Sequence, residues 1–271
     1  MYLKKFKPLL AISILFFSLL LNACKNESKE TKEEEKKEQK SSLTFKERAK
    51  RAVEAKLKIN ASEKYDIQIH KEYIDRDTLE DAVILVNREQ WAFERTEKNG
   101  NYDFAKKVGF TGPYNNVFVY LGKYDKFIST PTVGSSAESP LKVDFEVITT
   151  PSQKDFYVNY RIRNSVYRNY YTVRKDRVFL TFNCPVFDKI GEPKPEAYSI
   201  QHRDSPVRLA KDIALYHGKI PNYNPAEIQN INKYSPEKII PTDELYVFFI
   251  FDEKTMSYVT PMVNDEKGNE E

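Results

Sequence analysis

Eight short segments rich in aromatic and β-branched residues follow one another along this chain, and they constrain its fold more than any other feature. Such segments are typical of β-strands, because branched and aromatic side chains pack well on a pleated surface. The sequence therefore predicts a body made mainly of antiparallel sheet, arranged as a meander or a sandwich. The segments are residues 65–74, 82–86, 117–121, 143–148, 156–162, 167–173, 178–182 and 245–251.

Two parts of the body depart from this pattern. Residues 45–57 place their apolar side chains on one face at helical spacing, so an amphipathic helix is expected to open the body. Residues 185–241 contain eight prolines, which interrupt regular structure repeatedly. Short helices are expected between these breaks, near 207–216 and 225–231. The predicted fold class is β-rich α+β, with an N-terminal amphipathic helix and a proline-rich, partly helical C-terminal region.

The chain begins with three lysines, a 13-residue apolar run at 9–21 and the segment LNAC that ends at Cys24. A positive start, a short apolar run and a small residue before the cut are typical of a secretory signal, and 13 residues are few for a bilayer span. The pattern resembles the lipobox of bacterial lipoproteins. That resemblance implies cleavage of residues 1–23, acylation of Cys24 and anchoring in the cell envelope, and Lys25 resembles the sorting position of outer-membrane lipoproteins. An uncleaved anchor or a plain secretory signal is the alternative.

Removal of the signal leaves 40 basic and 40 acidic residues, because three of the 43 lysines and arginines precede Cys24. A neutral chain gives no reason to expect nucleic-acid binding, which needs a basic face. Residues 25–42 contain six Lys, six Glu and no apolar side chain, so 24–43 is expected to be a lipidated, disordered tether. The globular body then spans 44–261, and an acidic disordered tail spans 262–271.

An acidic loop, DRDTLED, precedes the apolar run AVILV. Calcium prefers oxygen ligands that one short loop supplies, and alternate residues of such a loop can point toward a common centre. Asp75, Asp77 and Asp81 are therefore candidate ligands of a structural calcium ion. The loop resembles a single calcium loop of FG-GAP and VCBS-type repeats, with Tyr73 and Thr78 in place of an acid and a glycine. The alternative is a solvated turn between strands.

Residues 156–182 are predicted to form a three-stranded meander with turns near 164–165 and 175–176. Strand alternation places tyrosine and arginine side chains together on one face of it. Tyrosine rings stack on sugars or peptide side chains, and guanidinium groups bind carboxylates or phosphates, so this face is a candidate site for an envelope glycan or a protein partner. The alternative is that these side chains pair across strands without a ligand. The candidate ligand-binding residues are Tyr157, Arg161, Arg163, Arg168 and Tyr170.

Catalytic motifs are missing from the sequence. His70, His202 and His217 show no metal spacing and are expected to be isolated residues, and no G-x-S-x-G motif is present. Cys184 has apolar neighbours and is expected to be buried, with no role as a nucleophile. The predicted function is therefore a non-catalytic binding or structural component of the cell envelope. The competing hypothesis is an envelope hydrolase with a cleft under the proline-rich region, which would draw its carboxylates from Asp75, Asp77, Glu80 or Asp144.

Overall fold

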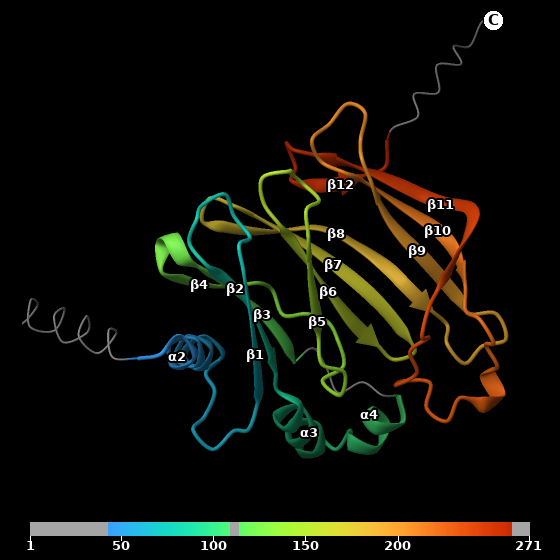
Figure 1. The fold of residues 1–271 in the computed structure, drawn as a ribbon. Coiled ribbons are helices and arrows are strands. Elements are labelled where there is room, and N and C mark those ends of the chain that lie inside the picture. The colour runs from blue at the N-terminus through green and yellow to red at the C-terminus, as the bar shows by residue number, and fades with distance from the viewer. Residues whose placement is uncertain (1–42, 109–113, 262–271) are drawn as a thin grey trace, which may run out of the picture. The chain divides into compact units, whose positions relative to one another are not determined.

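The computed structural model describes residues 43–108 and 114–261. The chain divides into two compact units, 1–52 and 53–271, and both β-sheets belong to the second. Figure 1 shows the elements in chain order. The predicted signal peptide, Cys24, the tether up to residue 42 and the acidic tail lie outside the described residues.

Helix α2 (Phe45–Leu57) confirms the predicted amphipathic helix. It begins with a capping box, in which the Thr44 N–H donates to Glu47 Oε2 at 2.8 Å and the Glu47 N–H donates to Thr44 Oγ1 at 3.3 Å. This reciprocal pair satisfies two N–H groups at the helix start that have no partner inside the helix. In the second unit, the Tyr65 hydroxyl donates to Glu54 near the helix end at 3.0 Å.

The first sheet has four antiparallel strands in the order β1-β2-β3-β4. Every residue of β2 is buried, as predicted from its continuous apolar run, and every residue of β3 is buried as well. A strand covered on both faces needs apolar side chains at successive positions, and the runs AVILV and VFVYL supply them. The strands are β1 (Asp66–Glu72), β2 (Asp81–Asn87), β3 (Asn115–Leu121) and β4 (Lys126–Ser129).

The second sheet has eight antiparallel strands, each paired with its neighbour in sequence. The predicted meander and its two turns are confirmed, because β6 turns into β7 at residues 163–164 and β7 turns into β8 at 175–176. The predicted β-rich class is therefore present. The strands are β5 (Lys142–Glu146), β6 (Asp155–Ile162), β7 (Ser165–Arg174), β8 (Arg177–Asp188), β9 (Glu196–Arg203), β10 (Asp212–Lys219), β11 (Ile240–Asp252) and β12 (Ser257–Val259).

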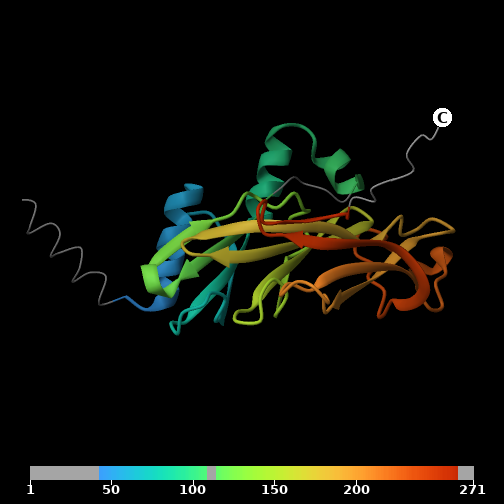
Figure 2. The same ribbon diagram turned by 90° about the horizontal axis from the view of Figure 1, so that it is seen from above.

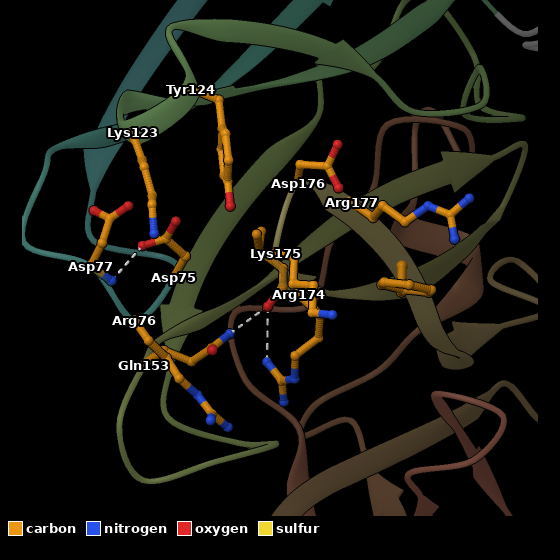
Figure 3. A pocket seen from close by; sticks show the side chains of 12 residues that line it. Asp75, Arg76, Asp77, Lys123, Tyr124, Gln153, Arg174, Lys175, Asp176 and Arg177 are labelled. Atoms are coloured by element: carbon orange, nitrogen blue, oxygen red, sulfur yellow. Dashed lines mark hydrogen bonds between the residues drawn. The ribbon is translucent and has the colours of Figure 1, made fainter.

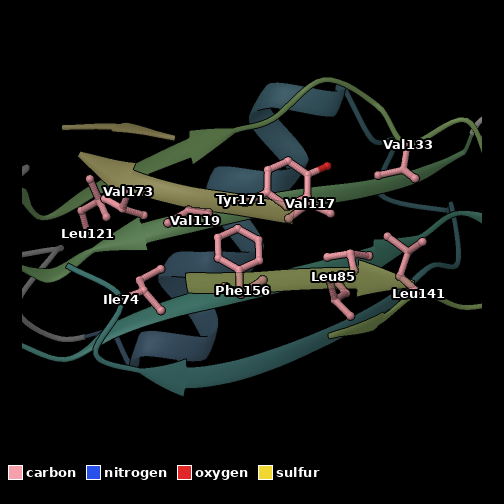
Figure 4. Packing of buried hydrophobic residues seen from close by; sticks show 12 residues of the cluster. Ile74, Leu85, Val117, Val119, Leu121, Val133, Leu141, Phe156, Tyr171 and Val173 are labelled. Atoms are coloured by element: carbon pink, nitrogen blue, oxygen red, sulfur yellow. The ribbon is translucent and has the colours of Figure 1, made fainter. Parts of the chain in front are cut away.

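A first apolar core joins the two sheets. Side chains of β2 and β3 meet one face of β6 and β7, as Figure 4 shows for Leu85, Val119 and Phe156. The rings of Phe156 and Tyr171 stack at 4.9 Å on neighbouring strands. Burial of one such ring stabilises the fold by about 1.5–3 kcal/mol. This core fixes the face of β6 and β7 that carries Phe156, so the residues between, such as Tyr157, face the opposite way.

A second apolar core forms because the eight-stranded sheet curls. Phe182 of β8 lies 4.4 Å from the ring of Phe249 in β11 and 5.7 Å from Tyr258 in β12. Figure 2 shows the red C-terminal strands beside the yellow strands of the sheet centre. Cys184 lies in this core, as predicted, and burial raises the pKa of its thiol to about 12.

The proline-rich region differs from its prediction. The expected helix near 207–216 is wrong, because Ile213 and Leu215 alternate into the second core and 212–219 is strand β10. Pro185 lies inside β8, opposite Tyr167 and next to a register shift, where a missing N–H is tolerated. The second expected helix is a single turn, the 3₁₀-helix η2 (Pro225–Glu227).

Helices α3 (Glu89–Lys98) and α4 (Tyr102–Val108) follow β2, in a region for which the sequence analysis made no prediction. Trp91 of α3 packs edge-on against Tyr114, with ring centroids 4.8 Å apart. Another 3₁₀-helix, η1 (Gly122–Tyr124), follows β3. In the described parts of the chain, no helix combines the length and the apolar character that a membrane span requires.

Candidate functional site

An open pocket of about 570 Å³ lies beside the β7–β8 turn, and the predicted acidic loop forms part of its wall. Figure 3 shows side chains that reach it from the loop before β2, from η1 and from β7 and β8. Five cationic and three acidic side chains line it, together with two aromatic rings, so we call it the basic pocket. Its lining is Asp75, Arg76, Asp77, Lys123, Tyr124, Gln153, Val173, Arg174, Lys175, Asp176, Arg177 and Phe179.

The acidic loop folds on itself through its own carboxylates. The Asp77 N–H donates to Asp75 Oδ1 at 2.8 Å, and the Leu79 N–H donates to Asp77 Oδ1 at 2.7 Å. Burial raises the pKa of Asp75, and the charge of Asp77 adds to the rise, while Lys123 opposes it. Figure 3 shows the Lys123 amine next to the Asp75 carboxylate. The loop therefore has the hydrogen bonds of a side-chain-stabilised turn.

Asp81, the third predicted calcium ligand, is engaged elsewhere. It is buried at the start of β2, where Oδ2 accepts from the Ile74 N–H at 3.1 Å and Oδ1 accepts from the Gly122 N–H at 2.9 Å. Burial raises the pKa of Asp81 to about 6, although these two N–H groups oppose the rise. Gly122 is required at this contact, because a Cβ there would lie 2.6 Å from the Glu80 carbonyl oxygen.

The three predicted ligands therefore do not converge on one point. Within residues 43–108 and 114–261, no group of three or more acidic, histidine or cysteine side chains is placed to hold a metal ion. Both oxygens of Asp81, and one oxygen each of Asp75 and Asp77, accept hydrogen bonds from the backbone, and Asp77 Oδ2 is buried without a partner among the described residues. The hydrogen bonds of the loop fit the turn that stood as the alternative, and a calcium ion at Asp75, Asp77 and Asp81 stays a prediction.

The cationic side chains of the basic pocket differ in the number of hydrogen-bond partners that they have within the protein. Arg174 is fixed, because its guanidinium donates to Thr172 Oγ1, Thr149 Oγ1 and the Val173 carbonyl oxygen at 2.8–2.9 Å. The side chains of Lys175 and Arg177 are exposed at the β7–β8 turn and make no hydrogen bond or ion pair with any described residue, although the charge of Arg177 also acts on Asp176. Asp176 between them pairs with Lys126 of β4 at 3.2 Å. Two unpaired cations therefore remain at the rim of the pocket.

The predicted tyrosine and arginine face is used mainly inside the protein. Arg161 is buried, and its guanidinium donates to the carbonyl oxygens of Arg163, Ile231 and Tyr234 and to Ser235 Oγ. This residue ties the segment after η2 to the end of β6. Arg161 is therefore buried and not exposed as expected, and both of its terminal nitrogens have acceptors within the chain, although the residue also lines a pocket of about 390 Å³.

Arg168, Tyr157 and Tyr170 form a cluster across strands. Such pairing without a ligand was the alternative to a binding face. The Arg168 guanidinium lies 4.0 Å from the centre of the Tyr157 ring, and its Nε donates to Asn159 Oδ1 at 2.8 Å. Tyr170 is 1% exposed and its ring is 5.3 Å from that of Tyr157. Tyr170 is therefore not exposed to a ligand, contrary to the expectation. Arg168 is half-buried, and its guanidinium donates hydrogen bonds to two side chains.

A polar network extends from this cluster that the sequence analysis missed. The Tyr170 hydroxyl lies 3.0 Å from His202 Nε2, and His202 Nδ1 lies 2.8 Å from Glu146 Oε2. Burial lowers the pKa of His202, and the neighbouring cations Arg168 and Lys211 lower it further, while Glu146 raises it. The network joins strands β5, β7 and β9. His202 is therefore not the isolated residue that was expected.

The remaining predicted residues are dispersed. Arg163 is exposed in the β6–β7 turn, with a left-handed φ of 53°. Asp144 lies on β5 opposite Tyr157, outside the lining of the basic pocket, and Glu80 pairs with Lys71 at 2.6 Å. Of the four carboxylates considered for a hydrolase, Asp75 and Asp77 alone line this pocket.

Two signals in the sequence pointed toward the basic pocket without identifying it. The acidic loop was singled out for calcium, and the turn RKDR of the meander was recognised as a turn. What joins them is the packing of β6 and β7 on β2 and β3, which brings together residues about 100 positions apart. Comparisons with protein-family models, with curated proteins and with solved structures found no match to this chain.

Proposed function

We propose that this chain is a lipid-anchored binding protein of the bacterial cell envelope whose ligand occupies the basic pocket. The observation that carries the proposal is the unpaired cations Lys175 and Arg177 at the rim of a pocket of about 570 Å³. An unpaired cation at a concave surface favours an anionic ligand, because charge-assisted hydrogen bonds are the stronger ones. The lipobox pattern at Cys24 supports the envelope location.

The class of ligand is inferred from the two kinds of side chain, aromatic and cationic, that line the pocket. Tyr124 and Phe179 line the same pocket as the cations, and Figure 3 shows the Tyr124 ring pointing into it from η1. An aromatic ring next to a cation suits a sugar that carries a carboxylate or a phosphate, since the ring stacks on the sugar while the cation binds the charge. We therefore propose an acidic envelope glycan as the ligand. The exposed protein-binding face predicted from the meander is not needed for this function.

The test is calorimetric titration of the full chain with cell-wall oligosaccharides that carry free carboxylates. Replacement of Lys175→Ala together with Arg177→Ala should weaken binding by at least about tenfold per residue, because each charge-assisted hydrogen bond contributes about 1.5 kcal/mol or more. The matched control is Lys142→Ala with Arg163→Ala, which removes the same charge from exposed positions outside this pocket. Equal affinity of both double variants and the unaltered protein would contradict the proposal.

A second candidate function is favoured by one observation in the same pocket. Burial raises the pKa of Asp75, and Asp77 lies two residues away. A carboxyl group held toward its protonated form beside a second carboxylate is the arrangement that a glycoside hydrolase uses as general acid. Mass spectrometry of the titrated oligosaccharides distinguishes the two functions. Shortened products that vanish with Asp75→Asn would establish a hydrolase, and intact oligosaccharides exclude it for these substrates.

A further inference from the structure

Three oxygen-bearing side chains stand in one row across the ends of β1, β2 and β3. Asp66 pairs with Asn87, and Asn87 pairs with Asn115, as directly opposed residues of antiparallel strands. Opposed residues in such a sheet carry their side chains on the same face, about 5 Å apart. Asp66, Asn87 and Asn115 also line one small cavity of about 10 Å³. The row lies at the opposite end of β2 from the basic pocket, about 20 Å away at about 3.3 Å per residue.

The orientation of both asparagine amides is fixed by the loop that covers them. The Asn87 Nδ2 donates to the Ala137 carbonyl oxygen at 2.7 Å. The Asn115 Nδ2 donates to Ser135 Oγ at 2.7 Å and to the Ser136 carbonyl oxygen at 2.9 Å. Carbonyl oxygens accept and never donate, so a reversed amide would set two oxygens against each other. The amide oxygens of both residues must therefore point away from these contacts.

Those oxygens have no partner. Asn87 Oδ1, Asn115 Oδ1 and the Oγ of Ser136 are buried and make no hydrogen bond with any described residue. Asn115 and Ser136 are at most 1% exposed, so solvent does not satisfy them from outside. A buried polar atom without a partner costs about 1–3 kcal/mol. Three such atoms on neighbouring residues indicate a guest that offers either hydrogen-bond donors or a positive charge.

The surroundings favour a positive charge. Asp66 is exposed at the cavity, and its carboxylate makes no hydrogen bond with any described residue. Asp66 is the one charged side chain among the residues that line this cavity. Neutral amide oxygens with a carboxylate at the edge are ligands that hard cations prefer.

We propose that this row is a binding site for one hard cation, of which Ca²⁺ is the best match, with Asn87 Oδ1, Asn115 Oδ1 and the Asp66 carboxylate, whose residues all line the cavity, as ligands. A bare Ca²⁺ binds oxygens at about 2.3–2.6 Å, closer than a water molecule approaches them. It therefore fits a space that holds at most about one water. The ion would connect the ends of three strands to the loop that covers them. Water molecules would complete its coordination at the exposed side of Asp66.

The experiment is a calcium titration of the full chain, followed by thermal unfolding and by terbium luminescence excited through Trp91, the one tryptophan of the sequence. Calcium at about 1–10 mM should raise the melting temperature, since extracellular calcium sites bind in the range of about 0.1–1 mM. The variant Asp66→Asn should bind calcium at least about tenfold more weakly and keep the melting temperature of the calcium-free protein, because Asp66 is exposed and has no hydrogen bond to lose.

The matched control is Asp75→Asn with Asp77→Asn, which removes the carboxylates of the acidic loop and leaves the row intact. This variant should keep the calcium response. Loss of the response in the loop variant and its retention in Asp66→Asn would assign the ion to the acidic loop and overturn the proposal. Absence of any calcium effect on the unaltered protein would also overturn it, leaving a buried water as the guest of the asparagine oxygens.

Discussion

At the scale of single residues, the most consequential groups are buried polar ones that carry a fixed set of partners. Arg161, Asp81 and His202 are each in contact with groups from distant parts of the chain. None of them is free to take a ligand in the described structure. Their effect is on stability, and for His202 that effect depends on pH.

His202 makes the fold sensitive to acid. Its pKa is lowered from an ordinary value of 6.5 by burial and by Arg168 and Lys211, against the opposing charge of Glu146. The unfolded chain therefore binds a proton that the folded chain resists, so stability is full above about pH 6.5 and is lost as the pH falls below it. We expect the melting temperature to fall more between about pH 7.5 and about pH 5.5 in the unaltered protein than in His202→Gln.

The unaltered protein has to be compared with His202→Gln, because buried carboxyl groups change the stability with pH in the opposite direction to His202. The pKa of Asp81 is raised to about 6, and that of Asp155 is raised by its burial, so both stabilise the fold as the pH falls. Both proteins contain these carboxyl groups, so their contribution cancels when one pH profile of the melting temperature is subtracted from the other. Identical pH profiles for His202→Gln and the unaltered protein would show that the imidazole does not titrate differently on folding.

At the scale of elements, the shortest strand has a large share in the second core. Tyr258 of β12 is 7% exposed, lies 5.2 Å from the ring of Phe251, and donates its hydroxyl to the Lys211 carbonyl oxygen at 2.9 Å. We expect Tyr258→Phe to lower the free energy of unfolding by about 1–2 kcal/mol, through the unpaired carbonyl oxygen. Tyr258→Ala should lower it by about 3–5 kcal/mol, through the lost ring.

Chemical denaturation followed by circular dichroism measures both values. Equal losses for the two variants would mean that the hydroxyl, and not the ring, is what β12 contributes. A loss below about 1 kcal/mol in Tyr258→Ala would mean that the curl of the sheet persists without this contact.

Elements with strong local patterns were predictable from the sequence, and those that depend on distant partners were not. The run AVILV is apolar at every position and identified β2 as a buried strand. The segment DIALYH of β10 is short and apolar enough to suit either a helix or a strand, and only its place between β9 and β11 decides the matter. Proline spacing did not reveal that Pro185 occupies an irregular point of β8.

Among the functional residues, too, local patterns were predictable from the sequence and contacts with distant residues were not. Tyrosine and arginine alternation predicted a shared face of the meander, on which Tyr157 and Tyr170 are directly opposed, whereas Arg163 lies in the β6–β7 turn. It did not show that the Arg161 donors would be taken by carbonyl oxygens about 70 residues further along. A short motif displays residue types, whereas the partners of a buried side chain are set by how the whole sheet curls.

At the scale of the whole molecule, the prediction concerns Cys24. The lipobox pattern predicts that cells fed with a labelled fatty acid incorporate the label into this protein, and that Cys24→Ser abolishes the label and releases the protein from the membrane fraction. Ser41→Cys in the Cys24→Ser background is the matched control, because it restores a thiol outside the lipobox. Labelling of Cys24→Ser, or of the control, would contradict the predicted anchor.

The order of strands in both sheets has a consequence for how the chain folds. Every strand pairs with the strand before it or after it in sequence, in β1 to β4 and again in β5 to β12. Eight of the ten pairings close a loop of at most eight residues, which costs little chain entropy, and the two longer connections are 88–114 and 220–239. A polypeptide threaded through a translocase from its N-terminus can add one hairpin after another as it emerges, without waiting for its far end. Such stepwise assembly leaves few strand edges exposed at any moment, which lowers the risk of aggregation during folding.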